Sequence, residues 1–193
     1  MGRPRGFDTD VALAKAMDVF WEHGYADATL PDLLTGMNLT RGSLYKAFTD
    51  KKTLFLRVLS TYDEQEVSAA VVLLSDQSQN GWIRIFKVFD SIAEAVRSGD
   101  QRGCLLCSAI AGPAAYDQDI NAFATKSLDR MLVAFETALE ALVPVGMSKP
   151  LANLLVTQYV GVRVMARVNG SISNIEQSTA ALKGIAENFD QKF

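Results

Sequence analysis

Apolar residues recur at intervals of three and four positions along almost the whole chain of 193 residues, and short polar segments separate these stretches. This period is that of an amphipathic helix, and no segment alternates in the two-residue period of a strand. We therefore predict an all-α fold of about nine or ten helices, without an internal repeat. The longer helices are expected over residues 8–23, 51–62, 64–75, 81–97, 104–115, 120–142 and 149–168, with a last one carrying Ile175, Leu182, Ile185 and Phe189.

Residues 29–54 predict two short helices that are joined by a tight turn and followed at once by a third helix. Thr29, Thr40 and Asp50 are good N-cap residues at the three helix starts. Asn38 stands where the chain must reverse, and Asn tolerates a left-handed backbone. This arrangement is that of a helix-turn-helix, which places its second short helix in the major groove of DNA.

The second short helix, residues 40–47, carries polar side chains on the side away from its apolar pair Leu44 and Phe48. Such hydrogen-bond donors suit base edges and phosphates. Lys51 and Lys52 fall in the first turn of the next helix, where cations oppose the helix dipole, and a nearby phosphate would explain them. The predicted DNA contacts in this stretch are Thr29, Thr40, Arg41, Gly42, Ser43, Tyr45, Lys46, Lys51 and Lys52.

Charge agrees with a local DNA-binding face and not with a basic protein. The formal net charge is −3, so non-specific DNA affinity is expected to be modest. Arg3 and Arg5 form a short basic arm that suits a minor groove, and the alternative is a solvated chain end.

Residues 12–55 resemble the DNA-binding domain of the tetracycline-repressor (TetR) family of bacterial regulators. The resemblance runs from the first helix with its Gly24-Tyr25 end, through 42–48, to 51–55. The chain departs from the family pattern at Leu34, at Met37-Asn38, at Lys52 and at Ala47, so position 47 is not counted as a contact.

The resemblance implies a DNA-binding domain over residues 1–50 and an effector-binding and dimerisation domain over 51–193. It implies a homodimeric, sequence-specific transcriptional regulator that binds a palindromic operator on double-stranded DNA. We expect a repressor that a small-molecule effector releases. The alternative is a helical interaction dimer that does not bind DNA.

The body offers candidates for a dimer seam and for an effector pocket. The helices near 120–142 and 149–168 each carry an apolar stripe, which a partner subunit or the chain's own core would cover. Aromatic and methionine residues of the middle helices would line a pocket or fill a core. The pocket candidates are Trp82, Phe86, Phe89, Tyr116, Phe123, Met131, Tyr159 and Arg163, with Arg167 and Gln158 as further polar partners.

Cys104 and Cys107 form a single Cys-x-x-Cys. No histidine lies near them, which argues against zinc. A thiol at a helix start beside Arg102 would have a lowered pKa and would suit a redox or electrophile sensor, and the alternative is a pair of buried structural cysteines. The Gly-Cys-Leu-Leu run at 103–106 also resembles an element of one branch of the TetR family, some members of which sense reactive compounds.

Other classes of function find little support. We find no nucleophile–base arrangement, no phosphate loop and no paired metal ligands, so we expect neither an enzyme nor a cofactor. No apolar run approaches the length of a membrane span, and no secretory signal is evident. We therefore expect a cytoplasmic protein.

Overall fold

The computed structural model describes residues 7–190, and within that range every regular element is helical. The predicted arm residues Arg3 and Arg5 lie outside the described residues. The α-helices are α1 (Thr9–Asp27), α2 (Leu30–Met37), α3 (Arg41–Phe48), α4 (Lys51–Tyr62), α5 (Ser68–Ser75), α6 (Gly81–Arg97), α7 (Leu105–Ala111), α8 (Gln118–Leu139), α9 (Ser148–Met165) and α10 (Ile172–Asp190). The all-α prediction is confirmed.

Three predicted elements differ in detail from the structure. The helix expected over 104–115 is α7 followed by a 3₁₀ turn, Pro113–Tyr116, because Pro113 has no N–H to continue the α-helical hydrogen bonds. α1 is interrupted at Gly24, whose φ of 76° and ψ of 167° are not helical. α4 continues into α5 through one π-helical turn, Asp63–Val67.

The first four helices form a head with its own apolar core. Phe20 of α1, Leu33 of α2, Leu44 of α3 and Phe55 of α4 are each at most 1% exposed. The Phe20 and Phe55 rings meet edge to face, with centroids 4.7 Å apart, a favourable aromatic geometry. Because α4 supplies part of this core, it serves as the base on which the short helices α2 and α3 are held.

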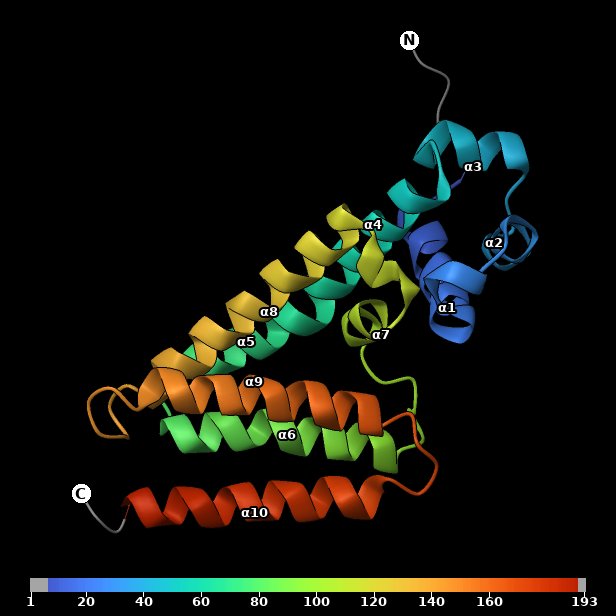
Figure 1. Ribbon diagram of the computed structural model, residues 1–193. Coiled ribbons are helices and arrows are strands. Elements are labelled where there is room, and N and C mark those ends of the chain that lie inside the picture. The colour runs from blue at the N-terminus through green and yellow to red at the C-terminus, as the bar shows by residue number, and fades with distance from the viewer. Residues whose placement is uncertain (1–6, 191–193) are drawn as a thin grey trace.

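The remaining helices form a larger body (Figure 1). α5 and α8 run side by side, and α9 packs across α8. Figure 1 shows α3 at the outer end of the head and α10 at the opposite end of the molecule. Among the described residues no helix is long and apolar enough to cross a membrane.

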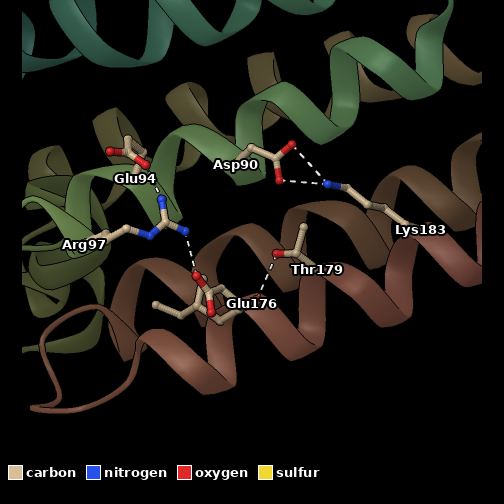
Figure 2. A network of polar contacts seen from close by, with 7 residues as sticks. Asp90, Glu94, Arg97, Glu176, Thr179 and Lys183 are labelled. Atoms are coloured by element: carbon tan, nitrogen blue, oxygen red, sulfur yellow. Dashed lines mark hydrogen bonds and ion pairs between the residues drawn. The ribbon is translucent and has the colours of Figure 1, made fainter.

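α10 is fastened to α6 by apolar contacts and by two ion pairs (Figure 2). Arg97 Nη2 lies 2.6 Å from Glu176 Oε1, and Lys183 Nζ lies 3.0 Å from Asp90 Oδ1. Exposed pairs of this kind each contribute at most about 1 kcal/mol. They fix the rotation of α10, so that one face meets α6 and the opposite face is left outward.

Candidate DNA-binding surface and effector region

α2 is capped at both of its ends, and its C-terminal cap forms the turn to α3. Thr29 N donates to Asp32 Oδ2 at 2.8 Å, and Asp32 N donates back to Thr29 Oγ1 at 3.3 Å, which is a capping box. Asn38 adopts the left-handed conformation, with φ 54° and ψ 47°. The Leu39 N–H then donates to the Leu34 carbonyl at 3.0 Å and closes the end of α2.

α3 is capped and presents a polar face to solvent. Ser43 N donates to Thr40 Oγ1 at 3.2 Å. Leu44 and Phe48 are both 1% exposed and hold the helix on the head. The side chains that remain outward are those predicted to meet DNA: Thr40, Arg41, Tyr45 and Lys46 are exposed, and Ser43 is half-buried. Gly42 is exposed, so nothing of the head covers the backbone there.

Arg41 and Tyr45 lie together on this outward face. The Arg41 guanidinium carbon is 5.7 Å from the Tyr45 ring centroid, within the range of a cation–π contact. This contact restricts Arg41 without occupying its hydrogen-bond donors. The pair therefore forms a partly ordered donor surface at the outer end of the head.

Lys51 is folded back onto the end of α1. Its Nζ donates to the Ala26 carbonyl oxygen at 3.0 Å and lies 5.0 Å from the Tyr25 ring centroid. Burial lowers the pKa of Lys51, and the nearby Asp27 charge opposes that shift. An ammonium has three donors, so the hydrogen bond to the Ala26 carbonyl leaves two for a phosphate.

Lys52 does not fit its predicted role as a DNA contact. Its Nζ lies 2.9 Å from Asp117 Oδ2 and 2.6 Å from Asp119 Oδ2, at the N-terminus of α8. The hydrogen bond to Asp119, followed by that to Asp117, raises the pKa of Lys52. Two carboxylates already neutralise this cation, so Lys52 joins the head to the body and we withdraw it from the contact surface.

The predicted pocket residues do not gather around one hollow. Trp82 stacks between Phe86 and Phe189, whereas Phe89 stacks on Phe135. Met131 is fully buried and Phe123 is partly buried. Tyr116 is 91% exposed on the 3₁₀ turn. We withdraw Tyr116 from the pocket, because a side chain in solvent lines no interior space.

Two of the pocket candidates instead join the cysteines in a buried polar cluster, consisting of Tyr62, Cys104, Cys107, Tyr159 and Arg163. The Arg163 guanidinium lies 5.4 Å from the Tyr159 ring centroid. Within residues 7–190 the buried Tyr159 hydroxyl and Arg163 Nε have no hydrogen-bond partner, and Arg163 Nη2 lies 3.9 Å from Glu66 Oε2. Buried polar atoms are normally paired, so these two are candidates to contact a ligand.

Both cysteines are free thiols inside this cluster, 2% and 0% exposed. Cys107 N donates to Cys104 Sγ at 3.4 Å at the start of α7. Hydrogen bonding from Cys107, then the Arg163 charge, hold the pKa of the Cys104 thiol below its usual range, although burial opposes them. The structure thus combines the two alternatives that the sequence left open, a buried position and a favoured thiolate.

Of the two helices predicted to form the dimer interface, α9 exposes part of its apolar stripe and α8 buries most of its own. The stripe of α8, including Ile120, Ala124, Met131 and Phe135, is buried against its own chain. On α9, Leu154, Val164 and Val168 just beyond its end are 42–50% exposed, and Gly161 lies on the same side. α10 adds Ile185, 45% exposed, on its outward face. α8 also leaves Val133 outward, at 60% exposed, but the rest of its stripe named above is covered by the body, whereas α9 and α10 expose several apolar side chains.

Comparison with known proteins agrees with the head geometry. Residues 12–58 match the family model described as bacterial regulatory proteins, tetR family. The HTH-type transcriptional repressor ComR of Escherichia coli (strain K12) is 35% identical over 106 residues, 54% of this chain and 50% of that protein. The repressor BdcR of the same organism is 29% identical over 117 residues, 60% of this chain and 57% of that protein. The chain thus spans about half the length of the curated relatives that it matches.

Solved structures match over nearly the whole chain. A CifR cysteine mutant of the TetR family, complexed with 26-bp double-strand operator DNA, has a TM-score of 0.79 and 26% identity, covering 93% of this chain and 99% of that one. SCO4454 of Streptomyces coelicolor has a TM-score of 0.83 at 19% identity, over 94% of this chain and 95% of that one, and shows the same fold. The matched family and relatives are named as regulatory proteins and transcriptional repressors. Residues 12–58 therefore match the family model of the tetR bacterial regulatory proteins, and nearly the whole chain is similar in fold to solved TetR-family regulators.

Proposed function

We propose that the protein is a homodimeric transcriptional repressor that binds a palindromic operator through α3 and is released by a small-molecule effector. The observation that carries the proposal is the outward face of α3, where Arg41, Tyr45 and Lys46 are exposed on a capped helix. The relatives named as repressors and the operator complex of the CifR mutant support it. Such a repressor acts on the chromosome, in the cytoplasm.

The side chains divide into two roles on the DNA. Arg41 and Ser43, with close backbone approach at Gly42, would meet base edges, since Arg pairs with guanine through two donors. Thr29, Tyr45, Lys46 and Lys51 would hold phosphates and set the register. We keep the division at residue 50 as a functional one, with DNA reading before it and effector binding and dimerisation after it.

Dimerisation is expected along the exposed faces of α9 and α10. One recognition helix reads only a few base pairs, so a specific operator usually needs two copies. Two helices from each subunit form a four-helix bundle, and Gly161 permits close approach of α9 to its partner. Burial of the exposed Leu154 and Ile185 side chains would stabilise the dimer by roughly 1.5–3 kcal/mol for each fully buried one.

The effector is proposed to reach Tyr159 and Arg163 in the body. Their unpaired polar atoms offer one donor–acceptor group and one donor beside Tyr62 and the two cysteines. These groups lie beside Tyr62 of α4, and α4 is the base on which α2 and α3 are held. Movement there would change the spacing of the two α3 helices in a dimer.

Cys104 is proposed as a reactive thiol in the same cluster, with Cys107 as its neighbour. The support is geometric: the sulfur caps the start of α7 and shares its surroundings with Arg163. Because Cys104 is 2% exposed, a reagent reaches it only when α7 loosens. The test is DNA release by a mild oxidant; if the Cys104→Ser variant still releases DNA, the sensor role is wrong.

The test of DNA reading begins with selection of bound duplexes from a random pool. We expect a palindromic consensus. Arg41→Ala should lower affinity for that consensus by about 1–3 kcal/mol, and it should relax sequence preference at one position of each half-site. Fluorescence anisotropy at one fixed salt concentration measures both effects, since affinity depends on salt.

Arg57→Gln is the matched control, because it removes the same charge from an exposed position on α4. It should leave the sequence preference unchanged. If the selection returns no consensus and Arg41→Ala binds like the wild type, the alternative of a helical interaction dimer without DNA binding replaces the proposal.

A further inference from the structure

A hollow of about 310 Å³ lies between the head and the body. On the head side it is lined by the last turns of α1 and the break at Gly24, and on the body side by α7, the start of the 3₁₀ turn and the end of α9. A space of this size lies at the lower end of the range for small-molecule sites. The Tyr159–Arg163 cluster does not line it.

The walls of this junction hollow are largely aromatic and aliphatic. Tyr25 and Pro113 present their side chains to the hollow, while Phe20, Phe55 and Leu105 lie behind its surface and are 1–2% exposed. An aromatic ring system of one or two rings would bury most of its surface against such walls. That burial contributes roughly 25 cal/mol for each Å² of apolar area removed from water.

One cation of the lining, Arg167 of the turn after α9, has only neutral acceptors. Its Nη1 donates to the Arg102 carbonyl at 3.3 Å and to Ser108 Oγ at 3.2 Å. In the part of the chain that the structure describes, Arg167 makes no ion pair within 4.0 Å. An anion placed in the hollow would therefore supply the counter-charge that this guanidinium lacks.

The two acids of the lining do not cancel that cation. Glu22 is 78% exposed and lies 4.0 Å from His23. Asp27 acts on the Lys51 ammonium, which sits on the neighbouring Ala26 carbonyl. Both carboxylates thus lie on the head wall of the hollow, and neither forms an ion pair with Arg167.

We propose that the junction hollow is a binding site for a small aromatic organic anion, with its rings against Tyr25 and Pro113 and its carboxylate on Arg167. The site is separate from the effector cluster proposed above. Its walls come from both the head and the body, so an occupant would stiffen their relative position.

A consequence for DNA reading rests on the proposed function. The wall at Tyr25 and Ala26 also anchors Lys51, which is a proposed phosphate contact. An occupant that contacts this wall would alter the position of Lys51 and hence the affinity for all duplexes alike.

The binding test needs no DNA. 1-Naphthoate is titrated into the full-length wild-type protein, and binding is followed by calorimetry and by amide shifts in a ¹H–¹⁵N spectrum. We expect saturable binding below about 1 mM, with the largest shifts in residues 20–27 and 105–114. The neutral 1-naphthamide should bind about tenfold or more weakly, since it lacks the charge-assisted hydrogen bond.

Arg167→Gln should reduce naphthoate affinity about tenfold and leave naphthamide affinity unchanged. Arg57→Gln, with the same change of net charge, should not alter either. Ala111→Trp, an exposed position on the lining, should block both ligands by filling the space. Thermal unfolding of each variant near the wild-type temperature establishes that it is folded.

Failure to bind naphthoate, equal binding by Arg167→Gln, or shifts confined to residues outside the two lining segments would each overturn the proposal. These outcomes do not depend on whether the protein binds an operator. A positive binding result with unchanged DNA affinity would keep the site and overturn only its link to Lys51.

Discussion

At the scale of single residues, two adjacent lysines have different partners. Lys51 Nζ touches a neutral carbonyl, whereas Lys52 Nζ meets two carboxylates. The sequence shows two cations in the first turn of a helix and predicts a phosphate for both. The acids that neutralise Lys52 lie some 65 residues further along the chain, so no local pattern predicts the difference.

Lys51→Ala is expected to weaken binding to every duplex alike and to reduce the slope of log affinity against log salt by about 1. Lys52→Ala should leave that slope unchanged, because its charge is already neutralised. Anisotropy titrations over a salt series, on the consensus and on a scrambled duplex, distinguish the two. If Lys52→Ala also reduces the slope, the ion pair between Lys52 and Asp117 must break when the protein binds DNA.

At position 103 the backbone conformation and the close packing against α9 both require a glycine. Its φ is 71°, and a Cβ there would lie 2.6 Å from the Arg163 carbonyl oxygen. Only glycine combines this backbone with that close approach. The Gly-Cys-Leu-Leu run thus has a physical reason in this chain, which is the tight passage of the chain over α9 before Cys104 starts α7.

At the scale of elements, the helix caps and the Lys52–Asp117 ion pair depend on the same interaction, a hydrogen bond accepted by an aspartate carboxylate. Asp32 and Asp50 accept hydrogen bonds at helix starts, and Asp117 accepts one from Lys52; these bonds lower the pKa of all three carboxyls. A group whose folded pKa is depressed contributes stability above its unfolded pKa, and that stability is lost as the pH falls through the folded value.

The free energy of unfolding should therefore decline as the pH falls below about 4, the ordinary pKa of an aspartate. Lys52→Gln should make this acid-side decline shallower, since Asp117 then loses its chief stabilising partner. Urea unfolding at a series of pH values measures both, with Lys149→Gln, an exposed lysine on α9, as the control of equal charge. If Lys52→Gln does not change how the free energy of unfolding declines with falling pH, the stabilising role of the Lys52–Asp117 ion pair is contradicted.

The elements themselves were largely predictable from the sequence. The caps at Thr29, Thr40 and Asp50 and the turn at Asn38 are local signals that the structure bears out, whereas Gly24 interrupts α1 and does not end it. The partners of the apolar faces were not predictable. The stripe of α8 and the exposed stripe of α9 are similar in the sequence, and only the three-dimensional packing shows that the first faces its own core.

The same reasoning explains why the pocket prediction failed. Trp82 and Phe89 both lie on α6 but stack on different partners, Phe189 and Phe135, and Tyr116 lies in solvent on the 3₁₀ turn. A cavity depends on how several helices leave space between them, which is a property of the packing. The junction hollow likewise combines residues from α1, α7 and α9, and no run in the sequence brings these together.

At the scale of the whole molecule, the proposed DNA-binding helix and the proposed dimer interface lie at opposite ends. α3 lies at the outer end of the head, and the exposed faces of α9 and α10 belong to the far part of the body (Figure 1). Dimerisation through the body would hold two α3 helices at a fixed separation. Successive major grooves on one side of duplex DNA are about 34–36 Å apart, so this separation sets the half-site spacing.

Leu154→Glu is expected to dissociate the dimer, because it places a charge in the apolar seam. Sedimentation velocity should show a shift from dimer toward monomer with the helical content unchanged. Lys149→Glu, at an exposed position on the same helix, serves as the control and should remain dimeric. A dimer that persists in Leu154→Glu would place the seam elsewhere.

The most direct test of the central claim compares one duplex that carries both half-sites of the selected consensus with a duplex of equal length in which one half-site is scrambled. We predict that two protomers bind the intact palindrome. Affinity for the duplex with a single half-site should be at least about 100-fold lower, which is within the range by which specific binding exceeds non-specific binding. Equal affinity for the two duplexes at the same salt concentration would contradict reading of DNA by paired α3 helices.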